Sequence, residues 1–174
     1  MQSPGGVLRS PDMDDAELGH LVDRGWRYAL ALTRDEDAAG DALQDAWLAM
    51  LRAGGEIGPG YLFAAIRSRI CDRSRRFGWQ VLTAPEDLPE PLAADEAPAP
   101  LGQVDNTALH AALARLRPDE REALHLTVVE GWSVERVADH QGRPRGTLLS
   151  LIHRARAKLR RTLAATQTER TDHG

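Results

Sequence analysis

Apolar side chains recur at helical spacing along the first part of the chain. From Leu18 to Leu32 they fall on one face of a single helix. Residues 33–35 interrupt this period, and Asp35 or Asp37 is placed to cap a second helix over residues 37–52. The residues expected to face the core from this second helix are Ala38, Ala42, Leu43, Trp47, Met50 and Leu51.

A third helix is predicted over residues 61–76, after a glycine-rich loop at 54–60. Its Leu62, Ile66 and Ile70 are spaced to face a core, and its arginines fall on the other side. Three amphipathic helices in this order predict a small helical domain.

The helical period is absent from residues 80–105, which contain five prolines. This composition is typical of a flexible linker without a core of its own. Residues 1–11, rich in Gly, Pro and Ser, and the tail 166–174 are expected to be disordered. No strand pattern is found, so the predicted fold class is all-α, with helical domains at 12–79 and 106–165.

The second domain has the pattern of a helix-turn-helix. One helix opens at 117–120, a second covers 133–141, and a third runs from about residue 145 to 163 after the turn 142–144. Leu109, Ala112, Leu113, Leu116, Ala123, Leu124, Leu126 and Val128 are the apolar residues expected to continue the helical period before the turn.

The last of these helices is densely basic. Between residues 143 and 161 there is no acidic residue and there are seven basic ones, Arg143, Arg145, Arg154, Arg156, Lys158, Arg160 and Arg161. A basic helix that follows a tight turn is a common device for placing side chains in the DNA major groove.

The charge is divided unevenly along the chain, although its formal net value is −4. Residues 81–105 carry six acidic residues and no basic one, whereas residues 67–76 carry five arginines and one aspartate. Two basic patches are therefore separated by an acidic linker, which is compatible with nucleic-acid binding despite the negative total.

The chain offers little that could support catalysis. It has no glycine-rich phosphate loop, and its six histidines are scattered without metal-ligand spacing. The single cysteine, Cys71, excludes an internal disulfide. We therefore expect no enzyme activity, no cofactor and no metal. Because no signal or membrane-spanning pattern is found, we expect a cytoplasmic protein that does not bind membranes.

Several motifs, taken in order, resemble one family. In the first domain they are Asp41-x-x-Gln44-Asp45-x-Trp47, Tyr61-Leu62-Phe63, Arg67 and Asp72-Arg73-x-Arg75-Arg76. In the second they are the segments at 115–124, 130–133 and 146–160. Together they resemble the extracytoplasmic-function (ECF, group IV) sigma factors of bacterial RNA polymerase, over roughly residues 14–164.

The resemblance implies that the first domain is sigma region 2 and the second is sigma region 4. It implies a protein that binds core RNA polymerase, through the β′ clamp helices and the β flap, and that directs initiation at particular promoters. The first domain would open the −10 element and the second would recognise the −35 element. An anti-sigma factor or an activator protein would be a further partner.

The resemblance also implies roles for individual residues. Those expected to contact core polymerase are Asp41, Gln44, Asp45 and Trp47. Those expected near the −10 element are Tyr61, Arg67, Arg69, Arg73, Arg75 and Arg76, with unpaired bases resting in the loop 54–60. Those expected to contact the −35 element are Arg145, Thr147, Ser150, His153, Arg154 and Arg156.

The helix-turn-helix departs from the family pattern at four positions. Gln141 and Arg143 flank the turn glycine where apolar residues are usual, and Leu149 and Leu151 stand where the reading face usually carries polar residues. The helical period predicts that both leucines point partly outward. Three explanations remain open: leucine contacts to thymine methyl groups, a binding site for a protein partner, or a sigma-like mimic that captures a regulator and does not initiate transcription.

Overall fold

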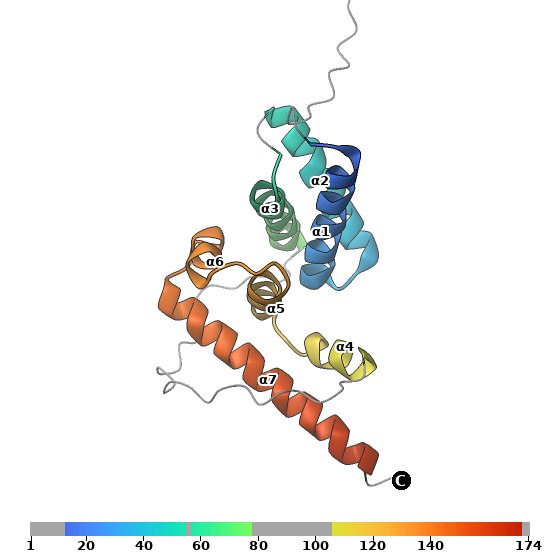
Figure 1. Cartoon of the computed structure of the whole chain (residues 1–174), viewed down its shortest axis with the longest axis vertical. Coiled ribbons are helices and arrows are strands. Elements are labelled where there is room, and N and C mark those ends of the chain that lie inside the picture. Colours follow the sequence, from blue (N-terminus) through green and yellow to red (C-terminus); the bar gives the residue numbers. More distant parts are fainter. Residues whose placement is uncertain (1–12, 55–56, 78–105, 172–174) are drawn as a thin grey trace, which may run out of the picture. The chain divides into compact units, whose positions relative to one another are not determined.

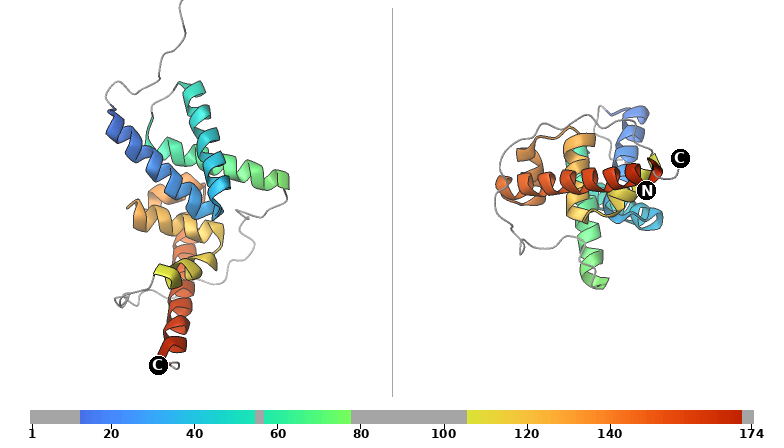
Figure 2. Two further views of the ribbon diagram at one scale, coloured as in Figure 1. Left: turned by 90° about the vertical axis from the view of Figure 1, so that its right-hand side faces the viewer. Right: turned by 90° about the horizontal axis from the view of Figure 1, so that it is seen from below.

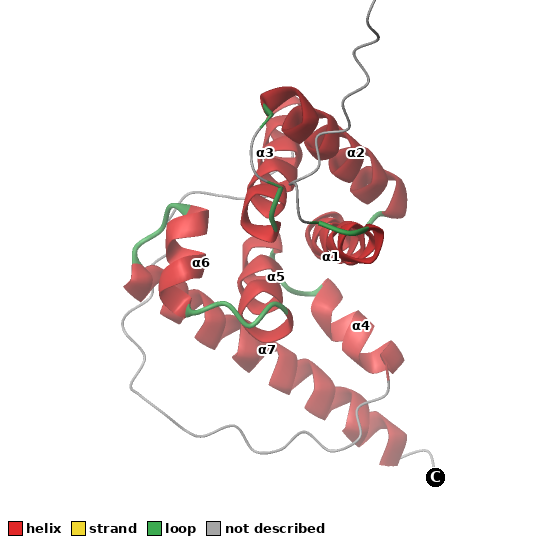
Figure 3. Ribbon diagram, turned by 45° about the horizontal axis from the view of Figure 1, so that its top comes forward, coloured by secondary structure: helices red, strands yellow, loops and turns green. Residues whose placement is uncertain are grey.

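The computed structural model describes the backbone of residues 13–54, 57–77 and 106–171, and the side chains of 13–54, 57–75 and 107–165. All regular elements in these ranges are helices, and none of the described residues forms a strand (Figure 3). The expected all-α fold class is thus confirmed. The chain divides into two compact units, Met1–Val81 and Leu82–Gly174. The segments expected to be a linker and a disordered N-terminus, 80–105 and 1–11, lie outside the described residues. The expectation of a disordered tail over 166–174 is wrong for residues 166–171, because they continue the last helix, and residues 172–174 lie outside the described part.

The first unit consists of three mutually packed helices, α1 (Asp15–Thr33), α2 (Glu36–Ala53) and α3 (Pro59–Phe77), as Figures 1 and 2 show. Local caps fix where α1 and α2 begin. The Asp14 carboxylate accepts a hydrogen bond from the backbone N–H of Glu17 at 2.7 Å, and that of Asp35 accepts one from Ala38 at 2.7 Å. Both contacts satisfy N–H groups that have no partner inside the helix.

The core of the first unit combines small residues on α2 with large residues on α1 and α3. Tyr28 and Phe63 are fully buried, and their rings stack with centroids 4.6 Å apart. The residues that α2 buries are Ala39, Ala42, Ala46 and Met50. The expected core set was therefore only partly right: Ala38, Leu43, Trp47 and Leu51 are half-buried. The alanine stripe lets the neighbouring helices approach α2 closely, so the larger residues lie at its margins.

The second unit places three shorter helices against one long one. Helices α4 (Asn106–Ala114), α5 (Pro118–Leu124) and α6 (Val134–Gln141) all pack against α7 (Arg145–Thr171). Between α5 and α6 lies a π-helical segment, η1 (His125–Val129). The expected turn before α7 is confirmed, because Gly142 ends α6 in the left-handed conformation, with φ 63°.

Two expectations about apolar residues in the second unit are wrong. Leu151 is 2% exposed and belongs to the core with Leu148, Ile152 and Ala155. Because α7 is covered by three helices, it buries a wider arc than a single stripe. Val128 is exposed, since the π-helical turn of η1 shifts the period that a regular α-helix would continue.

Candidate functional site

The first candidate surface is the exposed side of α2. Because the alanine stripe faces the core, Asp41, Gln44 and Asp45 lie exposed on the other side, and Trp47 is half-buried. Leu48 is also exposed and follows Asp41 and Gln44 at helical spacing. The sequence pattern had not identified Leu48, because an isolated leucine in an amphipathic helix is indistinguishable from a core residue. The surface is acidic, with one apolar side chain beside its carboxylates.

The second candidate surface is the basic side of α3. Arg69, Arg73 and Arg75 are exposed there, and Tyr61 is exposed near the start of the helix. Arg67 is half-buried. The side chain of Arg76, and residues 55 and 56 of the loop expected to receive unpaired bases, lie outside the described part of the chain.

These two surfaces meet at an ion pair. Arg73 Nη1 lies 2.8 Å from Asp41 Oδ2, and about half of each side chain is exposed. Arg75 pairs within its own helix with Asp72, at 2.6 Å. Sequence reasoning assigned Asp41 to one surface and Arg73 to another, so it did not foresee that they contact each other. An exposed pair of this kind is weak, about 0–1 kcal/mol, and can exchange for an intermolecular contact.

The third candidate surface is the exposed side of α7. Of the residues expected there, Arg145, His153 and Arg156 are exposed, while Thr147, Ser150 and Arg154 are half-buried. Arg154 Nε donates a hydrogen bond to the backbone carbonyl of Ser150 at 3.4 Å. Leu149 is 41% exposed on the same helix.

Arg145 is held by a carboxylate of the neighbouring helix. Its Nε donates to Glu135 Oε1 of α6 at 2.6 Å, and both side chains are well exposed. The pKa of Glu135 lies below its ordinary value. The main cause is a backbone hydrogen bond to its carboxylate, and the second is the hydrogen bond from Arg145. This contact joins the two helices of the helix-turn-helix at their outer surface.

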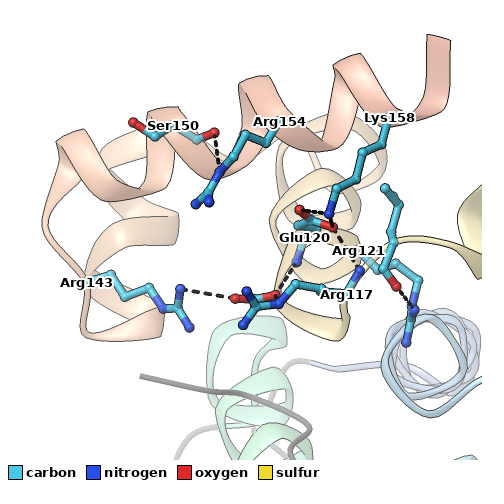
Figure 4. A network of polar contacts seen from close by, with 9 residues as sticks. Arg117, Glu120, Arg121, Arg143, Ser150, Arg154 and Lys158 are labelled. Carbon is cyan, nitrogen blue, oxygen red and sulfur yellow. Dashed lines mark hydrogen bonds and ion pairs between the residues drawn. The ribbon is translucent and has the colours of Figure 1, made fainter. Parts of the chain in front are cut away.

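Two of the seven basic residues of the 143–161 segment point into the unit instead of outward (Figure 4). Lys158 Nζ lies 2.6 Å and 2.9 Å from the two carboxylate oxygens of Glu120. Arg143 Nη1 lies 3.3 Å from Asp119 Oδ2. Asp119 and Glu120 are both buried on α5, so these cations hold α5 to the helix-turn-helix. Charge counting had included Arg143 and Lys158 with the exposed cations.

Gln141, the last residue of α6 before the turn, has a side chain without polar contacts in the described part of the chain. It is 7% exposed, and neither its side-chain oxygen nor its nitrogen has a hydrogen-bond partner within the described residues. Gln141 is therefore a buried polar residue at a place where the resemblance predicts an apolar one.

The described residues contain no cluster of three or more His, Cys, Asp or Glu side chains that could hold a metal ion. Within the same ranges, no helix combines the length and the apolar character needed to span a membrane. The described charged surfaces are an acidic one on α2 and basic ones on α3 and α7.

The second unit defines the class of protein. Residues 106–159, from the start of α4 into α7, match the family described as Sigma-70, region 4. This match places the helix-turn-helix among the RNA polymerase sigma factors.

Similar proteins define the family more closely. The chain is 32% identical over 147 residues to the ECF RNA polymerase sigma factor SigL of Mycobacterium tuberculosis, covering 79% of this chain and 81% of that protein. It is 32% identical over 149 residues to the RNA polymerase sigma factor CarQ of Myxococcus xanthus, covering 82% and 84%.

A solved structure is similar as well: the sigma factor RpoE of Bartonella quintana, in complex with the anti-sigma factor NepR. It superposes with a TM-score of 0.64 at 28% identity, covering 86% of this chain and 95% of that one. The chain belongs to the ECF sigma factor family, and it is a sigma factor that directs transcription initiation.

Proposed function

We propose that this chain, as a group IV sigma factor, binds core RNA polymerase through α2, the −10 element through α3 and the −35 element through α7. The observation that carries the proposal is the exposed basic side of α7, which follows a glycine turn within the part that matches sigma region 4. Exposed arginines at such a place can hold phosphates while neighbouring side chains reach base edges.

The partner of α2 is proposed from charge. Asp41 and Asp45 lie one helical turn apart on an exposed face, where they can pair with basic residues of the polymerase clamp helices. Leu48 adds an apolar contact beside them. Trp47, which is half-buried, is proposed to contribute part of its ring to the same contact.

An anti-sigma factor is a further proposed partner, because the similar Bartonella quintana structure contains one. The alternative of a mimic that captures a regulator rested on two outward leucines. The burial of Leu151 removes that pair and leaves Leu149 alone on the surface. The described geometry therefore favours a sigma factor that contacts promoter DNA itself.

Transcription in vitro tests the proposal, using core polymerase, this chain and a pooled genomic library, with start sites as the readout. We expect defined starts that share upstream elements. Asp45→Lys should reduce transcripts about tenfold at limiting sigma factor, which corresponds to about 1.4 kcal/mol of core affinity. Asp23→Lys, a matched charge reversal on the exposed side of α1, should leave them unchanged.

Equal transcript levels for the two variants would contradict the role of α2. Stable co-purification with core polymerase but no start sites would indicate an activator-dependent factor. A chain that does not bind core polymerase at all would contradict the proposal as a whole.

A second prediction concerns the arginines of α3. Arg69 forms no ion pair within the described residues, whereas Arg73 is already paired with Asp41. Arg69→Ala should therefore lower the salt slope of holoenzyme binding to a promoter fragment by about one. Arg73→Ala should lower the salt slope by less, because the Arg73 guanidinium of the parent exchanges between phosphate and Asp41. The measurement is promoter affinity across a series of salt concentrations, and equal slopes for wild type and Arg69→Ala would remove α3 from the DNA surface.

A further inference from the structure

One row of α7 side chains is exposed along the helix. It consists of Arg145, Leu149, His153, Arg156 and Arg160, which follow one another at intervals of three or four residues. Such spacing places them on neighbouring positions of one face. Three of the five are arginines and one is a histidine, and Leu149 is the single apolar member.

Leu149 has no apolar neighbour within this row. Leu151, the residue that would have enlarged it, is 2% exposed and packs in the core. The residues before and after Leu149 in the row are Arg145 and His153. A protein-binding site usually needs a contiguous apolar area, which one leucine between an arginine and a histidine does not provide. A polyanion with a small apolar group at its surface fits this row better.

Thymine in duplex DNA provides that combination. In the major groove its C5-methyl group is the distinguishing apolar feature, and the phosphates on either side carry negative charge. The first turns of a recognition helix are the part that contacts base edges. Leu149 lies there, three residues after Gly146, whose β-carbon position has open space around it.

We propose that Leu149 is a specificity-determining residue that contacts the 5-methyl group of one thymine in the −35 duplex. The inference rests on the proposed function of α7 and adds the base that the helix selects. Leucine cannot form a hydrogen bond with a base, so its selectivity comes from covering the methyl group. Burying one such group favours binding about fourfold.

The experiment replaces each −35 thymine of a promoter duplex in turn with uracil, which lacks only the methyl group. Affinity is measured with holoenzyme that contains the full chain. At one position, uracil should weaken wild-type binding about fourfold. Leu149→Ala should weaken binding to the thymine duplex by a similar factor and should no longer distinguish uracil from thymine.

Arg156→Ala serves as the matched control on the same row. It should weaken binding to thymine and uracil duplexes equally and lower the salt slope by about one, because its proposed contact is a phosphate. If Arg156→Ala changes neither affinity nor slope, α7 does not hold the duplex and the proposed function of this helix fails. If Arg156→Ala behaves as expected but uracil has no effect at any position, only the role of Leu149 is overturned.

Two further outcomes would also overturn the role of Leu149: a −35 element without thymine on either strand, or unchanged uracil sensitivity in Leu149→Ala. Leu149 is exposed, so its variant should retain the helical circular dichroism and melting behaviour of the parent. If Leu149→Ala leaves DNA binding intact and instead weakens binding to a protein partner, Leu149 contacts that protein and not DNA.

Discussion

Replacing Lys158 with Met should lower the free energy of unfolding of the second unit by about 2–3 kcal/mol. Glu120, which is 2% exposed, would lose the cation that contacts both of its carboxylate oxygens at 2.6 Å and 2.9 Å. The loss is smaller than for a fully buried pair for two reasons. Lys158 keeps 35% of its side chain exposed, and the backbone N–H of Arg117 still donates to Glu120 at 2.8 Å.

The measurement is amide hydrogen exchange in α5 and α7 of the full chain. Arg160→Met is the matched control, since it removes an exposed cation two positions further along α7. We expect Arg160→Met to change stability by less than about 0.5 kcal/mol. Adding Glu120→Gln to Lys158→Met should restore much of the loss, because no charge is then left buried. If Lys158→Met and Arg160→Met are equally stable, the pair of Lys158 and Glu120 does not hold α5 to α7.

Replacing Gln141 with Met should stabilise the second unit by about 1–2 kcal/mol. The Gln141 amide is 7% exposed and has no hydrogen-bond partner within the described residues, so folding removes it from water without replacing its hydrogen bonds. Methionine has a similar volume and no such requirement. The change in midpoint of denaturant unfolding of the full chain, followed by helical circular dichroism, measures the effect.

Gln141→Glu at the same site provides the opposite test. A carboxylate there would be buried without a cation of its own, so this variant should be less stable than the parent by at least about 2 kcal/mol. Gln44→Met, on the exposed side of α2, should have little effect on stability. A destabilised Gln141→Met would mean that the amide is satisfied in solution, and it would contradict this account of the turn.

The helices of both units could be predicted because their signals are local. Asp35 caps α2 by accepting a hydrogen bond from the backbone N–H three residues further on, and Gly142 ends α6 at the residue that follows it. Apolar spacing then gives the inner face of each helix wherever a single stripe is buried. It gave Leu62, Ile66 and Ile70 of α3 correctly, and all three are buried.

What could not be predicted depends on contacts distant in sequence. Lys158 and Glu120 are 38 residues apart, and Asp41 and Arg73 are 32 apart, so no local pattern links either pair. Counting basic residues therefore overestimated the exposed charge of α7. Leu151 was misplaced because the sequence does not show how many helices cover α7, and Val128 because a π-helical turn leaves no periodic signature.

In α7, the residues that anchor the helix are separate from those that are exposed, and this separation affects how the sigma factor can evolve. Leu148, Leu151, Ile152 and Ala155 anchor the helix in the core, and Lys158 anchors it through Glu120. The exposed positions 149, 153 and 156 take no part in that anchoring. If α7 recognises the −35 element as proposed, single substitutions there should change promoter choice at almost no cost in stability. Duplicated copies of such a gene can therefore acquire separate sets of target promoters by changing one surface residue at a time, without first passing through an unstable protein.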